Sequence, residues 1–267
     1  MLFRSKTRSA DITSLFELAP PKPQAVLIVE DPFGPNVVVE ALYDIEADAA
    51  FLSRLMGEPV AVEPLPDQDW IRQSQLGLAP VRAGRFFVYG AHDAGTVPAG
   101  VIAIRIEAGL AFGTGHHETT ALCLQALSQL AKAGRFPRIL DLGCGTGVLA
   151  IAAAKLWRVP ITATDIDPVA VQVARDNARI NGERPFIRAA TADGLVHPAI
   201  RGRAPFDLIV ANILAGPLTY LAPSLAAALA PGGVAVLSGL LRNQEQLVLS
   251  FYRSQGLVFR KALRDGP

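Results

Sequence analysis

The sequence predicts an α/β fold, in which a doubly wound, mostly parallel sheet is joined to a smaller N-terminal α+β domain. From residue 138 onward, short apolar runs alternate with helix-like stretches. The first of these runs ends in a glycine-rich turn. Apolar amino acids make up 51% of the 267 residues, which is enough for a sizeable buried core. This alternation is typical of a sheet that carries helices on both faces.

In the second part of the chain, each strand is expected where an apolar run is bounded by turn residues. Strands are expected at 138–143, 161–167, 185–193, 207–213, 233–241 and 257–263. Helices are expected at 148–157, 168–181, 217–230 and Gln244–Ser254. Pro168 suits the first turn of its helix, and Gly182 suits the position just after the end. The sequence therefore predicts a parallel sheet wound in both directions.

The first hundred residues differ, because prolines interrupt short β-branched runs. Strands are expected at 25–30, 36–43 and 85–90, with a helix around Asp48–Met56. A glycine-containing stretch near residues 95–100 suggests a connection between two parts. We therefore expect an N-terminal α+β domain at 1–94, a linker at 95–108 and the main domain at 109–267.

The composition argues against several classes of protein. With 25 basic and 24 acidic residues, the net charge of +1 gives no broad attraction to nucleic acid or to an anionic membrane. Two cysteines, Cys123 and Cys144, cannot form a disulfide framework, which favours the cytoplasm. The uncharged stretch from Leu208 to Leu241 is interrupted by prolines and glycines, so it does not predict a membrane helix. We expect a soluble cytoplasmic protein.

The turn after the first strand of the main domain indicates a nucleoside ligand. Its sequence, DLGCGTG at 141–147, has glycines at every second position, where the backbone can approach a ligand closely. A dinucleotide site would instead have G-x-G-x-x-G. Asp165 ends the next predicted strand, where a carboxylate can accept both hydroxyls of a ribose. Together these features suit a nucleoside without phosphates, such as S-adenosylmethionine.

With these motifs the chain resembles the class I S-adenosylmethionine-dependent methyltransferases, which have a Rossmann-like fold. The resemblance is closest to the PrmA family, which methylates ribosomal protein eleven of the large subunit. It rests on three strings: GLAFGTGHHETTA at 109–121, DLGCGTGVLAIAA at 141–153 and NILAGPL at 212–218. The resemblance covers about 109–265 closely and the segment from Leu65 to Tyr89 more weakly.

The resemblance implies contacts to S-adenosylmethionine from Thr120, Gly143, Asp165 and Asn212. Thr120 lies near a predicted helix N-terminus, which favours a carboxylate ligand. Asn212 ends a predicted strand, where its amide could hold a substrate amine or be an ordinary buried amide in a turn. Asp193 also ends a strand and is a second candidate for the adenine amino group. No general base is assigned.

The resemblance implies methyl transfer to lysine ε-amines and to the N-terminal α-amine of ribosomal protein eleven, with the N-terminal domain at 1–94 recognising that substrate. We expect the enzyme to be a monomer. Alternatives are another protein substrate, such as the electron-transfer flavoprotein β subunit, or a small molecule. A nicotinamide-dependent oxidoreductase and a non-catalytic nucleoside-binding module are the rivals from other classes. No tyrosine has a lysine four residues later, which argues against the oxidoreductase. His116 and His117 are adjacent and would point about 100° apart on a helix, so no metal site is expected.

Overall fold

The computed structural model describes residues 80–106 and 117–264, with shorter segments at 2–7, 25–30, 37–42, 50, 53–54 and 61–63. The chain divides into two compact units, Met1–Trp70 and Ile71–Pro267. No helix in the described part of the chain is both long and apolar enough to cross a membrane.

The first unit contains an antiparallel sheet. Its strands are β1 (Leu2–Thr7), β2 (Ala25–Glu30), β3 (Val37–Leu42) and β4 (Ala61–Glu63), in the order β2-β3-β1-β4. The predictions of β2 and β3 are confirmed. The strand β1 was not predicted, because its sequence LFRSKT mixes apolar and cationic residues without a β-branched run. The helix expected around Asp48–Met56 lies largely outside the described residues.

The second unit is built on a parallel sheet, as predicted. Its strands are β8 (Ile139–Leu142), β9 (Ile161–Asp165), β10 (Ile187–Thr191), β11 (Phe206–Asn212) and β12 (Leu229–Ser238). They lie in the order β10-β9-β8-β11-β12, and every neighbouring pair is parallel. The first strand therefore lies in the middle, and the chain winds outward from it in both directions. Ligands in such folds bind where the winding reverses, at the carboxyl ends of the central strands.

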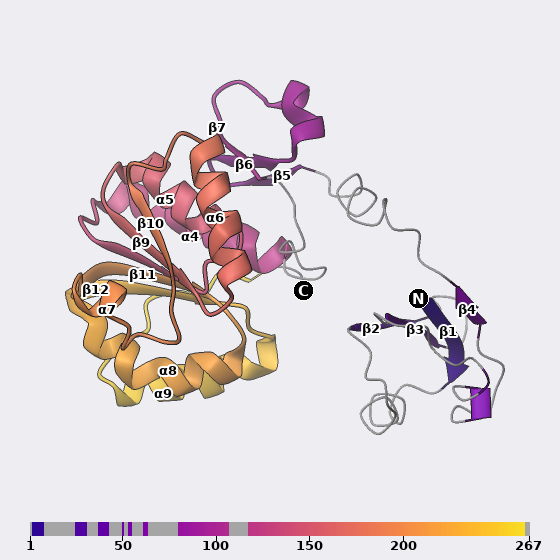
Figure 1. Ribbon diagram of the computed structural model, residues 1–267. Helices are drawn as coiled ribbons and strands as arrows, with labels where there is room; N and C mark the ends of the chain where they lie inside the picture. The colour runs from indigo at the N-terminus through magenta and orange to yellow at the C-terminus, as the bar shows by residue number, and fades with distance from the viewer. Residues whose placement is uncertain are drawn as a thin grey trace. The chain divides into compact units, whose positions relative to one another are not determined.

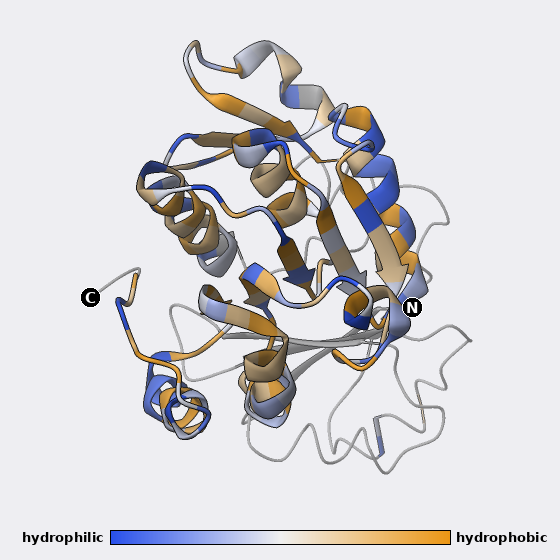
Figure 2. Cartoon of the chain, turned by 90° about the vertical axis from the view of Figure 1, so that its left-hand side faces the viewer, coloured by the Kyte–Doolittle hydropathy of each residue, from blue (hydrophilic) through white to orange (hydrophobic). Residues whose placement is uncertain are grey.

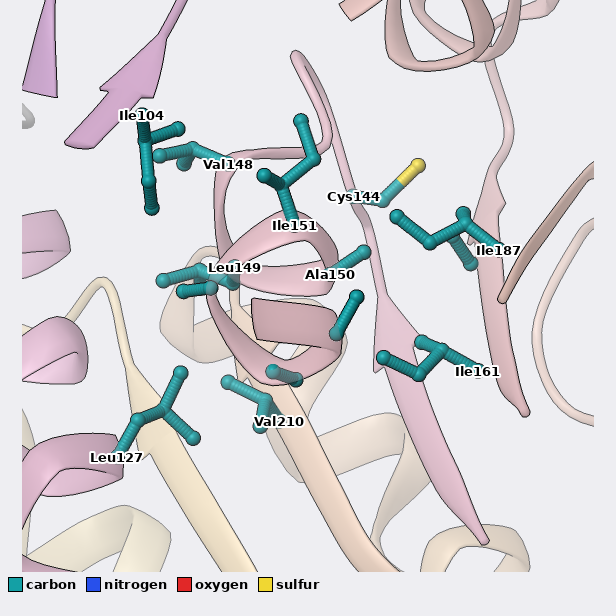
Figure 3. Close-up of a cluster of buried hydrophobic side chains, with 14 of the residues drawn as sticks. Ile104, Leu127, Cys144, Val148, Leu149, Ala150, Ile151, Ile161, Ile187 and Val210 are labelled. Carbon is teal, nitrogen blue, oxygen red and sulfur yellow. The ribbon is translucent and has the colours of Figure 1, made fainter. Parts of the chain in front are cut away.

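Helices cover both faces of this sheet (Figure 1). The helices are α4 (His117–Ala133), α5 (Val148–Trp157), α6 (Pro168–Ile180), α7 (Pro198–Arg201), α8 (Ala215–Ala228) and α9 (Glu245–Ser254). Neighbouring strand residues point to opposite faces, so Leu208 joins the core beneath α4 and α5, while Ile209 joins the core beneath α8 and α9. Figure 3 shows the first core, where the side chains of α5 lie between Leu127 and Ile161.

The last helix is amphipathic, and the chain after it is not a strand. In Figure 2, α9 lies next to the C-terminal tail and carries hydrophilic and hydrophobic residues on different sides. The strand predicted at 257–263 is wrong, because the described residues 257–264 have no regular secondary structure. Apolar alternation alone does not make a strand without a sheet edge to pair with. Lys261 instead donates a hydrogen bond to Gln129 of α4, and Arg264 pairs with Glu245 of α9.

A small three-stranded sheet belongs to the second unit. It consists of β5 (Val81–Ala83), β6 (Phe86–Tyr89) and β7 (Ile102–Arg105), with the short 3-10 helix η1 (Ala91–Thr96) between β6 and β7. Phe86 and Ile104 are fully buried in the core that contains α4 and α5. The described residues 80–106 therefore lie in the second compact unit, because their apolar side chains pack in its core.

Candidate functional site

The loop between β8 and α5 takes a shape that only glycines allow. Gly143, Gly145 and Gly147 have φ angles of +69°, +51° and +78°. A Cβ atom at Gly143 would collide with Ile213, and one at Gly147 would lie 3.0 Å from the Cβ of Ala174. At Gly145, in contrast, no atom lies within 4 Å of that position. The loop is thus packed at both ends and open in the middle.

Asp165 fixes this loop to the end of the neighbouring strand. One carboxylate oxygen accepts a hydrogen bond from the Gly145 N–H at 2.8 Å, and the other accepts one from the Asp167 N–H at 3.0 Å. Asp167 in turn caps α6 by accepting a hydrogen bond from the Val169 N–H at 2.8 Å. The Asp165 carboxylate is only half-buried, so it keeps further acceptor capacity for a ligand.

A second set of hydrogen bonds joins the start of α4 to the ends of β11 and β12. Asn212 Nδ2 donates to Thr120 Oγ1 at 3.1 Å. Ser238, which pairs in register with Asn212, donates from its hydroxyl to the Thr119 carbonyl oxygen at 3.3 Å. The Asn212 Oδ1 atom is buried and has no hydrogen-bond partner among the described residues. An unsatisfied buried acceptor is costly, so a ligand or substrate that donates a hydrogen there would be favoured.

The structure brings the predicted site residues to one edge of the sheet. Thr120 and Asn212 share a hydrogen bond, and Gly143 lies against Ile213, the residue after Asn212. Asp165 reaches the same glycine loop through the Gly145 N–H. Asp193 follows β10 and is exposed. The string at 109–116, which ends at His116, lies outside the described residues, and α4 begins at His117.

Asp141 was not among the predicted site residues, although it lies two residues before Gly143, where the loop begins. Its side chain is buried, and Oδ2 accepts a hydrogen bond from the Ala150 N–H at 2.9 Å. Its Oδ1 atom has no hydrogen-bond partner in the part of the chain that the structure describes. Burial raises the pKa of this carboxyl to about 7; the Ala150 hydrogen bond opposes the shift, and the charge of Asp165 adds to it. The sequence showed an acidic residue here but not its burial.

Both cysteines are buried, and neither is suited to act as a nucleophile. Burial raises the pKa of the Cys123 thiol to about 12 despite a hydrogen bond with Ser238. Burial likewise raises the pKa of the Cys144 thiol well above its ordinary value. Thiols in this state are unreactive near neutral pH. Within the described residues, no group of three or more His, Cys, Asp or Glu side chains is arranged to hold a metal ion.

These groups fit a nucleoside that carries hydroxyls and a short polar tail. Asp165 offers a fixed carboxylate for hydroxyl donors, and Gly145 leaves open space above the loop. Asn212 Oδ1 is a buried acceptor that a hydrogen-bond donor of the ligand could satisfy. Thr120 lies in the first turn of α4. A helix N-terminus favours a carboxylate group on a ligand. No phosphate is needed to account for any of these features.

Comparisons with known proteins point in one direction. The family model described as ribosomal protein L11 methyltransferase (PrmA) matches residues 23–266. A ribosomal protein L11 methyltransferase from Brucella suis is 53% identical over 236 residues, which cover 88% of this chain and 82% of the relative. One from Mesorhizobium japonicum is 56% identical over 212 residues, covering 79% and 73%.

A solved structure agrees with these relatives. It is the crystal structure of a ribosomal protein L11 methylase from Lactobacillus delbrueckii subsp. bulgaricus, which is 29% identical in sequence. The TM-score is 0.63, and the match covers 71% of this chain and 94% of the other.

Proposed function

The chain belongs to the ribosomal protein L11 methyltransferase family, and from this premise we propose that it methylates lysine ε-amines and the N-terminal α-amine of ribosomal protein L11. The methyl donor is S-adenosylmethionine, which supplies an electrophilic methyl carbon on a sulfonium centre. The observation that carries the proposal is the hydrogen bond between Asn212 and Thr120. It lies beside the glycine loop, which Asp165 fixes through the Gly145 N–H.

Each predicted site residue has a role that its surroundings support. Asp165 accepts the ribose hydroxyls, because its carboxylate is oriented by two backbone N–H groups and remains half-exposed. Gly143 allows the loop backbone to approach the donor closely. Thr120 binds the methionine carboxylate of the donor, because it lies in the first turn of α4, where the helix dipole favours a negative charge.

Asn212 positions the amine that receives the methyl group. Its Nδ2 atom is used by Thr120, which fixes the rotation of the amide and leaves Oδ1 as the free acceptor. An amine that donates one hydrogen to Oδ1 is held with its nitrogen lone pair free. Catalysis then comes mainly from positioning and from removing water around the amine.

The amine must be neutral when it reacts. A solvated lysine has a pKa of about 10.4, so roughly one in a thousand is neutral near pH 7.4. An N-terminal α-amine, with a pKa of about 7.7–8.0, is neutral far more often. The proton passes to water or to a weak acceptor, and no side chain of the site is assigned as a base.

The first unit, Met1–Trp70, selects the protein substrate, and the second unit carries the chemistry. The reaction takes place in the cytoplasm, where ribosomal proteins are made, and the enzyme acts as a monomer. Two buried thiols and no disulfide among the described residues suit a reducing compartment.

The test is a transfer assay with labelled S-adenosylmethionine, in which ribosomal protein L11 and electron-transfer flavoprotein β subunit are offered side by side. Intact mass and peptide mapping should show whole-methyl increments on lysines and on the N-terminus of L11 alone. Asp165→Ala should lower the rate by about 100-fold or more, because it removes charged hydrogen bonds to the donor. Asp176→Ala, on the exposed side of α6, is the matched control and should keep full activity.

Methylation of the flavoprotein subunit alone would reassign the substrate. Increments confined to other side chains would contradict the assigned amines. Full activity in Asp165→Ala would contradict the assigned cofactor contact.

A further inference from the structure

The buried face of α6 carries an asparagine that is hydrogen-bonded to the glycine loop. Asn177 is 1% exposed, and its Nδ2 atom donates to the Thr146 carbonyl oxygen at 3.0 Å. Ala174, which precedes Asn177 by three residues and shares its face of α6, lies against Gly147. An amide in an apolar interior is costly unless it is paired. The Asn177 amide therefore fixes the direction of the loop carbonyl, which apolar packing alone would not do.

A second asparagine, at the C-terminal end of α6, is hydrogen-bonded to the end of β7. Asn181 Oδ1 accepts from the Arg105 N–H at 3.0 Å, and Asn181 Nδ2 donates to the Arg105 carbonyl oxygen at 2.6 Å. β7 is an edge strand of its sheet, and its next residue, Ile106, donates to the Tyr89 carbonyl oxygen of β6. The backbone groups of Arg105 therefore face away from β6. The Asn181 amide pairs with them as the backbone of a neighbouring strand would.

The two asparagines connect three segments that are far apart in the sequence. Asn181 Nδ2 also donates to the Asn177 carbonyl oxygen at 2.8 Å, one helical turn away. The glycine loop is in turn bonded at two successive residues, because Asp165 accepts from the Gly145 N–H and Asn177 donates to the Thr146 carbonyl. Hydrogen bonds thus run from the loop through α6 to the end of β7.

We propose that Asn177 and Asn181 are positioning residues for the methyl donor, through which α6 fixes the glycine loop and the end of β7 relative to each other. The inference rests on the proposed function for the donor's contacts, but not for the amine that is methylated. A loop that must become ordered when a ligand binds costs affinity, whereas a loop fixed in advance does not. In the described chain, β7 is the element before α4. The asparagines therefore fix the loop that contains Gly143 and the strand that precedes Thr120.

The test compares Asn177→Leu and Asn181→Ala with the wild type in the full-length chain. Calorimetry measures the Kd for S-adenosylmethionine. Leucine resembles asparagine in shape but leaves the Thr146 carbonyl without its donor, so Asn177→Leu should raise this Kd about 10-fold. Asn181→Ala should raise it about 3-fold, because Asn181 is only half-buried and water can replace part of its hydrogen bonding.

Two further measurements distinguish positioning from other roles. The kcat at saturating S-adenosylmethionine should stay within about twofold of the wild type, because a misplaced loop weakens donor and transition state alike. Amide hydrogen exchange of the ligand-free protein should become faster in the loop at 143–147 in Asn177→Leu, and at Arg105 in Asn181→Ala.

Ser128→Ala is the matched control, because it removes another buried hydrogen bond between distant segments. The Ser128 hydroxyl accepts from the Arg85 N–H at 3.2 Å. Its loss should lower the unfolding temperature, as Asn177→Leu also does, but leave the Kd for S-adenosylmethionine within about twofold. An unchanged Kd in both asparagine variants would overturn the inference, as would an equal rise in Ser128→Ala or a loss confined to kcat. If Asn177→Leu does not fold, Asn181→Ala decides, and an unchanged Kd there overturns the inference.

The same measurements separate this inference from the proposed function. If the wild type binds S-adenosylmethionine but methylates no amine of L11, the assigned reaction is wrong, yet a raised Kd in the variants still supports the role of the two asparagines. If the wild type methylates L11 and both variants bind the donor as tightly as the wild type does, only the inference about Asn177 and Asn181 fails.

Discussion

Asp165 ends β9, and Asp141 lies one residue before the end of the neighbouring strand β8, yet their surroundings give them different properties. Asp165 is half-buried, and both of its carboxylate oxygens accept backbone hydrogen bonds. Asp141 is fully buried, and only one of its carboxylate oxygens has a hydrogen-bond partner among the described residues. Burial without full hydrogen bonding disfavours the charged form, which is why the pKa of Asp141 rises to about 7.

A pH-dependent stability follows from Asp141. Because its pKa is raised in the folded state, the unfolded chain loses this proton first as the pH rises from about 4. The free energy of unfolding should therefore fall, on the order of 4 kcal/mol, as the pH rises to about 7, and then level off. Asp141→Asn cannot titrate, so its unfolding free energy should lack this fall. Urea unfolding of both proteins between pH 4 and 8 measures the difference.

Other titrating groups are shared by the two proteins, so the comparison isolates Asp141. Any cost of burying the asparagine amide does not vary with pH. Two pH profiles that run parallel would show that Asp141 is ionised without penalty in the folded chain.

Only part of the site could be predicted residue by residue. The glycines and Asp165 belong to one local strand-turn-helix pattern, so their spacing in the sequence was informative. The hydrogen bond from Asn212 to Thr120 joins residues 92 positions apart, and no local pattern shows such a contact. The start of α8 was predicted two residues late, because no capping side chain marks it in the sequence.

At the scale of elements, Ser238 helps to hold α4 against the sheet. Its hydroxyl bonds to the Thr119 carbonyl oxygen, next to Thr120, and also contacts Cys123 one turn further along α4. The start of α4 is thus held by the ends of two strands, through Asn212 of β11 and Ser238 of β12.

Removing the Ser238 hydroxyl should loosen the start of α4. Ser238→Ala should raise KM for S-adenosylmethionine about 3- to 10-fold with little change in kcat, and lower stability by about 1 kcal/mol. Ser238→Thr keeps the hydroxyl and should recover most of the lost affinity. Ser224→Ala removes a hydroxyl bonded within α8 and is the control. Steady-state kinetics with varied S-adenosylmethionine measure these effects. A fall in kcat with an unchanged KM would contradict the proposed role of Ser238 in holding the start of α4.

Elements with strong local signals were predicted well. The helix α5 was predicted at its observed bounds, and α6 to within one residue, because apolar runs and a proline mark them. The missed strand β1 and the wrong strand at 257–263 share one cause. Whether a short segment becomes a strand depends on a pairing partner far away in the sequence, not on its own residues.

At the scale of the whole molecule, the chain is two units with separate internal packing. The small sheet β5–β7 packs on α4 and α5, so it belongs with the second unit rather than with the first. Where the two compact units divide is set by the packing of apolar side chains, which no local sequence pattern shows. The proposed roles also divide, with substrate selection in the first unit and cofactor binding in the second.

A fragment that spans Ile71–Pro267 tests this division. Because it contains Thr120, Gly143, Asp165 and Asn212, it should bind S-adenosylmethionine with a Kd within about threefold of the full chain. Its kcat/KM for ribosomal protein L11 should fall about 100-fold or more, since the first unit no longer captures the substrate. Calorimetry and the transfer assay measure the two values. Equal activity of fragment and full chain would show that substrate selection lies in the second unit.

The two hydrophobic cores fill opposite faces of the sheet, whereas Asn212 lies at its carboxyl edge and belongs to neither core. Changes in the loops that follow such an edge leave the packing of both faces intact. Evolution can therefore alter what the edge recognises without first repairing the scaffold. Duplicated copies of such a gene can acquire different targets while they retain one scaffold.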